Sequence, residues 1–398
     1  MIRFHAETHA GKVRSQNEDA MFADGANGVF VVADGVGGRA AGEVASALTA
    51  ETVKRLVPAI RVHLDAYAEN PDWEHRNAML SALESVCQDA SKTVYEEAER
   101  LSKRGMTTTV VMMAVHSGTA FLAHVGDSRA YLIRDGLIQQ LTEDHSMVNE
   151  LIRTGQMTLV EAATSKYRNV ITRAVGLHPN VQVDVMSIDI LPGDRVLLCS
   201  DGMSDPVSNE QLESLGCRDD VQTAAGNLLN AALDAGAPDN VTVVIVDPDA
   251  TPQAEAARAR AQIMETLFLF SDLPFHARLR VARICEARTI EPKEVIAEQD
   301  EPGNAMYIMV QGQVNVTRNG KTLAQLGTGQ HFGEMSLLDE QPRSATVTST
   351  RSGSVMIIRR EALMELCNRE PGLGNKVLMS LATSLARRLR NTNEAVPS

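Results

Sequence analysis

The fold of the N-terminal region is decided by Val31-Val32-Ala33-Asp34-Gly35-Val36-Gly37-Gly38, an apolar run that ends in an aspartate and a glycine-rich turn. Continuous apolar runs, in contrast to alternating ones, predict strands that are covered on both faces. Such runs occur at 28–33, 107–114, 119–125, 195–199 and 240–246. Helical spacing with few breakers is found at 41–57, 77–104, 209–216 and 220–235. These patterns predict an α+β protein whose first 247 residues form layered sheets with helices outside.

The composition describes a packed protein with more than one domain. The chain has 398 residues, of which 44% are hydrophobic and 22% charged, and a chain of this length usually exceeds one hydrophobic core. Its formal net charge of −13 argues against nucleic-acid binding, which needs basic surface. The five cysteines form no C-x-x-C pair, which favours reduced thiols. The sequence shows neither a signal peptide nor a membrane-spanning run, so we expect a cytoplasmic protein that does not bind membranes.

A change of composition after Asp247 predicts a domain boundary. The run Asp247-Pro248-Asp249-Ala250-Thr251-Pro252 breaks regular structure, and 253–264 is predicted to be an exposed helix. A β-roll with flanking helices is predicted beyond it, because short strands between 290 and 360 are separated by glycine turns. The glycines are Gly303, Gly312, Gly320, Gly327 and Gly329. We therefore expect domains at 1–247 and 263–394, a linker and helix at 248–262, and a tail at 395–398.

Acidic residues stand at strand ends or in glycine-containing turns of the N-terminal domain. They are Glu18, Asp19, Asp34, Asp201 and Asp239. Carboxylates gathered at one end of a sheet repel one another unless cations lie between them, and Mg²⁺ or Mn²⁺ prefers such oxygen ligands. Two such ions about 3.5–4 Å apart can clamp a phosphoryl group and generate a hydroxide nucleophile at neutral pH.

In this order the acidic segments resemble the PPM family of metal-dependent Ser/Thr protein phosphatases. The match extends to Gly105–Thr109, Val125–Arg129, Glu143–Ser146 and Ile171–Gly176, so that it covers nearly all of 1–247. The resemblance implies an α/β/β/α sandwich with a binuclear Mn²⁺ or Mg²⁺ site in a cleft at one edge. It also implies a bacterial-type signalling enzyme that hydrolyses phosphoserine and phosphothreonine, with phosphorylated proteins and a Ser/Thr kinase as partners.

The same resemblance implies a set of metal-binding residues. They are Glu18, Asp19, Asp34, Gly35, Asp127, Asp201 and Asp239. Asp34 is expected to bridge both ions with help from the Gly35 carbonyl, while Asp201 and Asp239 complete the ligand set of the other ion. Glu18 and Asp19 are expected to bind or orient metal-bound waters. Asp127 matches the position of a third, weaker metal.

The expected catalytic set combines a phosphate clamp with three of these ligands. Arg14 is the clamp, because a guanidinium fork matches phosphate oxygens bidentately. The alternative interpretation of Arg14 is a solvated surface arginine. The full set is Arg14, Asp34, Asp201 and Asp239.

One departure from the family concerns the general acid. Some members have a histidine directly after the bridging Asp-Gly, whereas this chain has Val36. We do not expect His124 or His145 to replace it, because a lone histidine near a strand or turn is usually a hydrogen-bonded structural residue. The segment 147–170 falls where the family has a mobile flap beside the cleft.

A second site is predicted from Gly329–Leu338 and the residues Gln341–Val347. A glycine before a short helix lets backbone N–H groups approach an anion, and Arg343 can neutralise a phosphate. Glu334 beside a phosphate needs a hydrogen-bond donor, which a ribose 2′-hydroxyl supplies. These residues resemble the phosphate-binding cassette of cyclic-nucleotide-binding domains, with similarity over roughly 263–394. A barrel that kept its shape and lost its ligand is the alternative.

The cassette and the last helix resemble those of the bacterial catabolite activator protein. In that protein, as here, a serine follows the arginine, and this serine is Ser344. By the same match Thr392, with Asn393 from a second subunit, favours cAMP and a homodimer built through this helix. Binding of cGMP remains open. The expected nucleotide-binding residues are Gly333, Glu334, Met335, Ser336, Arg343, Ser344, Thr392 and Asn393.

The two resemblances together imply a protein phosphatase regulated by a cyclic nucleotide. Two alternatives stay open. The barrel could serve an active phosphatase only for docking or dimerisation, or the whole chain could be a catalytically silent, cyclic-nucleotide-dependent binding protein. Manganese-dependent hydrolysis and nucleotide titration distinguish the three.

Overall fold

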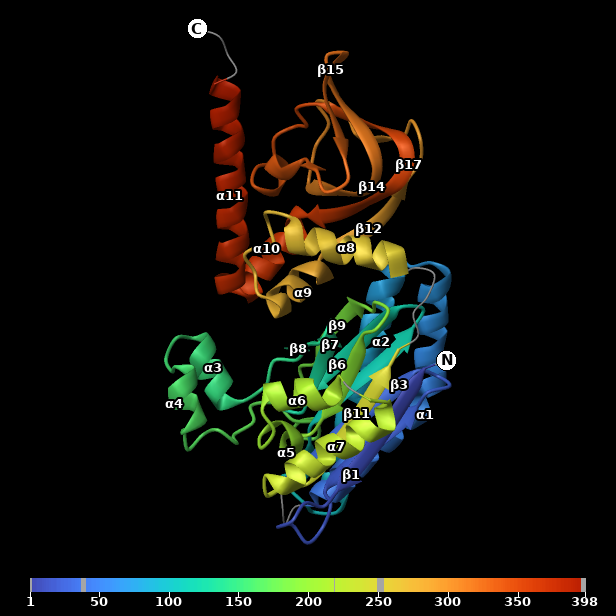
Figure 1. The fold of residues 1–398 in the computed structure, drawn as a ribbon, viewed down its shortest axis with the longest axis vertical. Helices are drawn as coiled ribbons and strands as arrows, with labels where there is room; N and C mark the ends of the chain where they lie inside the picture. Colours follow the sequence, from blue (N-terminus) through green and yellow to red (C-terminus); the bar gives the residue numbers. More distant parts are fainter. Residues whose placement is uncertain (1, 37–40, 218, 249–253, 395–398) are drawn as a thin grey trace. The chain divides into compact units, whose positions relative to one another are not determined.

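The computed structural model describes residues 2–36, 41–217, 219–248 and 254–394. The predicted tail, and the side chains of Thr392 and Asn393, lie outside the described part. The chain divides into two compact units, residues 1–254 and 255–398 (Figure 1). Each unit is described by itself below.

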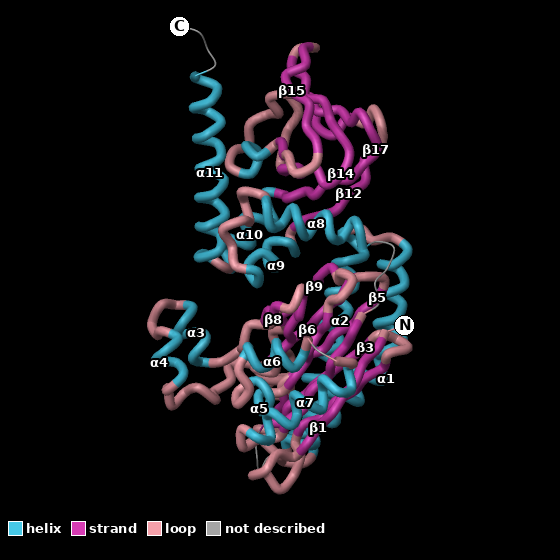
Figure 2. The backbone as a smooth tube through the Cα atoms, in the orientation of Figure 1, coloured by secondary structure: helices cyan, strands magenta, loops and turns pink. Residues whose placement is uncertain are grey.

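The first unit contains two antiparallel sheets with helices outside them (Figure 2). One sheet has the order β1 (Arg3–His9), β11 (Val241–Asp247), β10 (Arg195–Cys199), β7 (Arg129–Arg134) and β8 (Leu137–Gln140). The other has the order β2 (Asp19–Asp24), β3 (Val29–Val36), β5 (Val110–His116), β6 (Thr119–Val125) and β9 (Asp184–Asp189), and β4 (Thr107–Thr108) pairs with β3. The predicted α/β/β/α sandwich is confirmed.

The helices of this unit fall on the outer faces of the sheets and in the loops. They are α1 (Gly42–Glu69), α2 (Trp73–Arg100), α3 (Met147–Arg153), α4 (Leu159–Ala163), α5 (Asp201–Ser204), α6 (Asn209–Gly216) and α7 (Val221–Asp234). Helices α1 and α2 share a buried core with β3, β5 and β6, and α6 and α7 share another with β10 and β11. The strands are covered on both faces, as their continuous apolar runs predict: every residue of β6 is buried.

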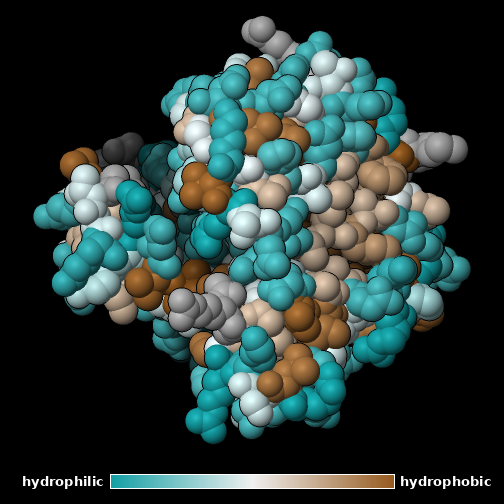
Figure 3. All heavy atoms as spheres, turned by 90° about the horizontal axis from the view of Figure 1, so that it is seen from below, coloured by the Kyte–Doolittle hydropathy of each residue, from teal (hydrophilic) through white to brown (hydrophobic). Residues whose placement is uncertain are grey.

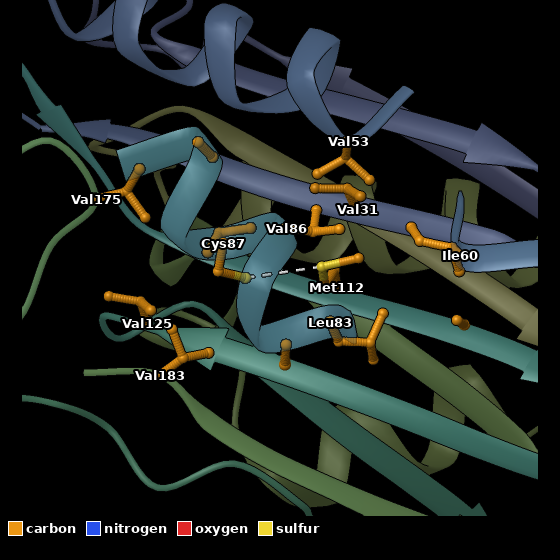
Figure 4. Packing of buried hydrophobic residues seen from close by; sticks show 14 of the residues in the cluster. Val31, Val53, Ile60, Leu83, Val86, Cys87, Met112, Val125, Val175 and Val183 are labelled. Atoms are coloured by element: carbon orange, nitrogen blue, oxygen red, sulfur yellow. Dashed lines mark hydrogen bonds between the residues drawn. The ribbon is translucent and has the colours of Figure 1, made fainter. Parts of the chain in front are cut away.

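Figure 4 shows the core between α1, α2 and the second sheet. Val53 of α1 lies against Val31 of β3, and the Cys87 thiol of α2 lies 3.8 Å from the Met112 sulfur of β5. Burial raises the pKa of the Cys87 thiol to about 12, so this cysteine acts as a small apolar residue. All five cysteines are free, as expected.

Helix α1 is longer than predicted. The sequence pattern ends at 57 because Pro58 follows, yet the helix continues through Pro58 to Glu69. An interior proline costs about 3 kcal/mol. The extension buries Ile60 and Leu64 completely, and each such side chain contributes about 2–3 kcal/mol. Burial of the apolar face therefore outweighs the cost of the proline.

The second unit is a β-roll with flanking helices, as predicted. Its main sheet has the order β12 (Cys285–Ile290), β17 (Thr346–Arg359), β14 (Ala305–Arg318) and β15 (Lys321–Gly327), while β13 (Val295–Ala297) pairs with β17 and β16 (His331–Phe332) pairs with β14. The helices are α8 (Ala254–Thr266), α9 (Phe275–Arg283), α10 (Arg360–Arg369) and α11 (Pro371–Glu394).

Two expectations for this region are wrong. Gly312 does not lie in a turn: it lies inside the long strand β14, where its φ of +93° accompanies a register shift against β17. Glycine tolerates this backbone without a steric cost, so it bends a strand here and does not end it. Helix α8 is not simply exposed, because Ile263 and Met264 on one of its faces are buried in the core of the second unit.

The face drawn in Figure 3 carries both hydrophilic and hydrophobic side chains, and the hydrophobic ones form continuous areas between the hydrophilic ones. Within the described ranges, none of the helices combines the length and apolar character needed to cross a bilayer.

Candidate functional site

The predicted acidic residues lie at chain positions where strands of both sheets begin or end. Asp34 lies near the end of β3, and Asp19 pairs with it directly as the first residue of β2. Asp201 follows β10, Asp239 precedes β11, and Asp127 lies in the turn between β6 and β7. Because the strands of each sheet are antiparallel, these starts and ends meet at one edge of the sandwich.

The electrostatics show that these carboxyl groups crowd one another. Burial raises the pKa of Asp34 well above its ordinary value, and the charges of Asp19, Asp201 and Asp127 add to the rise. Burial also raises the pKa of Asp201 to about 7, with Asp127 and Asp205 adding to it. The pKa values of Asp19 and Asp127 rise to about 6, in both cases mainly through burial. Without a cation the cluster cannot be fully ionised at neutral pH.

Two oxygen atoms in this cluster are buried without a hydrogen-bond partner in the described structure. They are Oδ1 of Asp19 and Oδ1 of Asp201. The other oxygen of Asp19, Oδ2, accepts hydrogen bonds from Ser200 Oγ at 2.8 Å and Thr242 Oγ1 at 2.6 Å. An ionised carboxylate accepts only, so the two hydroxyls donate to one oxygen and leave the other for a ligand.

The donor set fits hard divalent cations that keep part of their water. In the described ranges, no three His, Cys, Asp or Glu side chains form a group that could hold a metal ion by themselves. Mg²⁺ usually keeps several waters and binds through one or two carboxylates. Asp34, Asp201, whose charge raises the pKa of Asp34, and the backbone of the adjacent Gly35 can supply such a partial set.

The predicted phosphate clamp also lies at this edge. Arg14 Nη2 donates to Asp239 Oδ2 at 2.7 Å, and half of the Arg14 side chain is exposed. The hydrogen bond to Asp239 is the main cause of a raised Arg14 pKa, and the charges of Glu18 and Asp34 contribute. Arg14 therefore faces the acidic cluster and remains accessible to a ligand from solvent.

Asn240 organises the loop that carries these residues, and the sequence analysis missed it. Its Nδ2 donates to the Gln16 carbonyl at 2.8 Å and the Ala10 carbonyl at 3.0 Å. Its Oδ1 accepts from the Glu18 backbone N–H at 2.8 Å. In the sequence, the position of Asn240 directly after Asp239 is the signal that could have pointed to this role.

The turn carrying Asp127 is joined to Asp34 through hydroxyl groups. Ser128 Oγ lies 2.6 Å from Thr109 Oγ1, and that same Thr109 oxygen accepts from the Asp34 backbone N–H at 3.1 Å. Gly126 has a φ of +109°, and a Cβ there would meet the Thr109 side chain at 2.6 Å. Close packing of this turn therefore requires glycine.

In the second unit the predicted phosphate ligand is buried and held in place. Arg343 Nη1 donates to Ser336 Oγ at 3.0 Å, and the guanidinium lies 5.6 Å from the centre of the Tyr307 ring. Only 9% of Arg343 is exposed, and burial lowers its pKa. A buried cation of this kind is costly unless an anion compensates it.

Two glycines make room for the Arg343 guanidinium. A Cβ at Gly303 would lie 2.3 Å from Nε, and a Cβ at Gly333 would lie 2.4 Å from Nη1. Gly333 has a φ of +76° and precedes the 3-10 helix Glu334–Leu337, in agreement with a glycine before a short helix. The space for the guanidinium therefore depends on the absence of side chains at these two backbone positions.

The other predicted nucleotide ligands divide into three groups. Glu334 and Ser336 are buried, and Ser336 accepts from Arg343, whereas Met335 and Ser344 are exposed. Thr392 and Asn393 lie in α11, but their side chains are outside the described residues.

Comparisons with known proteins agree with both halves of this description. Residues 8–235 match the protein phosphatase 2C family, and residues 287–370 match the cyclic nucleotide-binding domain. The first match covers more than half of the chain, and the chain belongs to the protein phosphatase 2C (PPM) family.

Bacterial Ser/Thr phosphatases are among its relatives. The chain is 38% identical over 248 residues to the serine/threonine protein phosphatase PstP of Mycobacterium tuberculosis, with 62% of this chain but only 45% of that protein covered. It is 34% identical over 267 residues to the serine/threonine phosphatase stp of Listeria monocytogenes, with 64% and 99% covered. A crystal structure of the PstP catalytic domain in complex with two manganese ions has a TM-score of 0.52 and 36% identity, with 62% and 97% covered.

Proposed function

We propose that the chain is a Mn²⁺- or Mg²⁺-dependent phosphatase acting on phosphoserine and phosphothreonine in proteins. The observation that carries this proposal is the acidic cluster, in which burial and mutual repulsion raise the pKa of Asp34 and Asp201. The buried Oδ1 atoms of Asp19 and Asp201 have no partner in the described structure. Such an arrangement is costly as it stands and is stabilised by divalent cations.

Different residues of the chain would bind the metal ions and the phosphate. Asp34, Asp201 and Asp239 would hold two ions, with the Gly35 carbonyl as a further donor, and Asp127 would hold a third. Bound there, the ions would supply charge to neutralise phosphoryl oxygens and acidify water. Arg14 would bind the phosphate from the exposed side, since its guanidinium already reaches the rim of the cluster through Asp239.

Two further sets of residues position this machinery. Ser200 and Thr242 donate to Oδ2 of Asp19 and thereby fix the orientation of this carboxylate. Thr109 holds the backbone of Asp34. Val36 cannot donate a proton, so the proton for the leaving alcohol must reach it from water or another group.

We further propose that a cyclic nucleotide, cAMP before cGMP, binds the second unit and alters the phosphatase rate. The support is the buried Arg343, which two glycines and Ser336 hold ready for an anion. Glu334, in the short helix that follows Gly333, is buried and is suited to accept from the ribose 2′-hydroxyl. A ligand can regulate only if its affinity differs between the states of the whole chain, so the states that differ in phosphatase rate must also differ in nucleotide affinity.

A paired assay on the full chain tests both parts of the proposal. Metal is removed by chelation, and hydrolysis of p-nitrophenyl phosphate and a phosphothreonine peptide is followed as MnCl₂ is added. The active protein is then titrated with cAMP and, separately, cGMP. Asp201→Asn is the control for the metal site, and Arg343→Ala is compared with Arg318→Ala, which replaces an exposed arginine at the end of β14 in the same unit.

The outcomes separate the three functions. Manganese-dependent hydrolysis with a nucleotide response that Arg343→Ala removes supports the full proposal. Hydrolysis without any nucleotide response leaves the barrel as a docking or dimerisation element. Nucleotide binding in calorimetry without hydrolysis by folded protein would show a silent binding protein.

A further inference from the structure

The segment 147–170, called the flap segment below, stands apart from the sheets of the first unit. It contains α3 and α4, which project from the body of that unit (Figure 1). None of the α3 residues is buried. The position of the flap segment therefore depends strongly on its base, where both ends of the segment leave the sandwich.

The two ends of the flap segment are hydrogen-bonded to each other. Ser146 and Ile171 form an isolated antiparallel bridge. The Met147 N–H donates to the Val170 carbonyl at 2.8 Å, and the Thr172 N–H donates to the His145 carbonyl at 2.7 Å. The base therefore behaves as a short two-stranded ribbon that begins at His145.

His145 also connects this ribbon to the turn that carries Asp127. Its backbone N–H donates to the Gly126 carbonyl at 2.8 Å, and its ring Nδ1 lies 3.1 Å from the Gly126 nitrogen. A backbone N–H only donates, so Nδ1 must accept and the ring hydrogen lies on Nε2. Only 6% of His145 is exposed, so water does not readily replace this hydrogen bond.

The far side of the ring is held by an ion pair. His145 Nε2 lies 3.3 Å from Asp184 Oδ2, and Arg173 Nη1 donates to Asp184 Oδ1 at 2.9 Å. Arg173 Nη1 also lies 3.0 Å from Nε2, but a guanidinium only donates and can give its hydrogen to the Asp184 carboxylate. With the hydrogen on Nε2, that carboxylate accepts from both partners and Nδ1 accepts from Gly126. The ring of the buried His124 lies against the His145 ring, with centroids 4.6 Å apart and the ring planes inclined by 35°.

The flap segment also reaches the acidic cluster electrostatically. Partial burial and the charge of Asp144 raise the pKa of Asp205, while the charges of Arg129 and the flap residue Arg168 oppose that rise. Asp205 in turn raises the pKa of Asp201. Asp205 directly follows the short helix α5, which begins at Asp201, so the flap residue Arg168 carries its charge near one side of the acidic cluster.

We propose that His145 is a positioning residue that couples the flap segment to the Asp127 turn through its Nδ1 atom, and thereby sets discrimination between phosphoproteins and small phosphate esters. The proposal rests on the phosphatase function proposed above. A phosphopeptide extends beyond the phosphate and meets the flap segment, whereas a small aryl phosphate does not. Loosening the base should therefore affect the peptide substrate more strongly.

Two isosteric variants separate the two sides of the ring. In His145→Asn the amide oxygen can occupy the place of Nδ1 and accept from Gly126. In His145→Gln the amide nitrogen can occupy the place of Nε2 and donate to Asp184, but the hydrogen bond from Gly126 is lost. We expect His145→Asn to retain the wild-type ratio of kcat/KM for a phosphothreonine peptide over p-nitrophenyl phosphate. We expect His145→Gln to lower this ratio about threefold to tenfold, the factor corresponding to one neutral hydrogen bond.

Two readouts do not depend on activity. In His145→Gln, trypsin should cleave at Lys166 and Arg168 of the flap segment about threefold to tenfold faster, because one hydrogen bond of the base is lost. Hydrogen exchange of the full wild-type chain should show the Gly126 and Thr172 amides protected, a measurement that needs no variant to fold. If both hold in a protein without phosphatase activity, the proposed function fails while the coupling stands.

The proposal is overturned by any of three results. The first is a Gly126 amide that exchanges in the wild type as fast as exposed loop amides. The second is a folded His145→Gln protein with the wild-type substrate ratio and cleavage rate. The third is a His145→Asn protein whose substrate ratio is lowered as strongly as that of His145→Gln, because the hydrogen bond of Nδ1 would then not account for the ratio.

Discussion

Replacing Asp127 with asparagine should stabilise the metal-free protein at neutral pH. Burial raises the pKa of Asp127 to about 6 from an ordinary value of about 4. The unfolded chain then loses its proton first, so stability falls as the pH rises from about 4 to about 6 and stays low above that range. Two pKa units correspond to about 3 kcal/mol, which partial exposure reduces to about 1–3 kcal/mol. Asparagine has the shape of aspartate without the charge and removes this penalty.

The assay is thermal unfolding of both proteins in EDTA between pH 4.5 and 8. For a unit of this size 1 kcal/mol shifts Tm by about 2–4 °C, so Asp127→Asn should unfold about 2–12 °C higher at pH 7.5, and the difference from the wild type should be much smaller at pH 4.5. Asp89→Asn makes the same charge change at an exposed position of α2 and should leave Tm nearly unchanged. A metal-free Asp127→Asn protein that is less stable than the wild type at pH 7.5 would refute the reasoning, since the carboxylate would then be stabilising.

The other predictions concern the two proposed sites. Asp201→Asn should lower manganese-dependent hydrolysis by several orders of magnitude while far-UV circular dichroism stays unchanged, because a ligand charge is lost; near-normal activity at saturating Mn²⁺ would exclude the assignment. Arg14→Ala should raise KM for a phosphopeptide about tenfold to a hundredfold with a smaller effect on kcat, since the lost contact is charge-assisted binding; unchanged kinetics would leave Arg14 as a surface residue. Arg343→Ala should weaken cAMP binding in calorimetry at least about a hundredfold, because a bidentate charge-assisted pair is removed; wild-type affinity would place the nucleotide elsewhere.

Much of the fold could be predicted because the strands are read from local patterns. The runs at 119–125 and 195–199 coincide with β6 and β10, and the helix predicted at 209–216 coincides with α6. Prediction was wrong where tertiary contacts outweighed a local signal. Pro58 does not end α1 because the buried face continues beyond it, and Gly312 does not end β14.

In the candidate site, too, some residues could be identified from local sequence and others only from tertiary contacts. Asp34 and Asp201 were found from sequence because each follows an apolar run. Ser200 and Thr242 were not identified as partners of Asp19, although both donate to its carboxylate. Residue 242 is 223 positions from Asp19, and no local pattern records a hydrogen bond over such a separation.

The identity of the strands and the chemistry that they carry follow from local sequence: apolar runs encode strands, and aspartates placed after them encode oxygen ligands. How these groups meet follows from the folded chain. It brings Asp19 and Asp34 into register, raises their pKa values by burial, and selects Nδ1 of His145 as the acceptor for Gly126. The physical reason is that periodicity and turn chemistry act between neighbours in the chain, whereas desolvation and side-chain hydrogen bonds depend on distances in space that the fold alone sets.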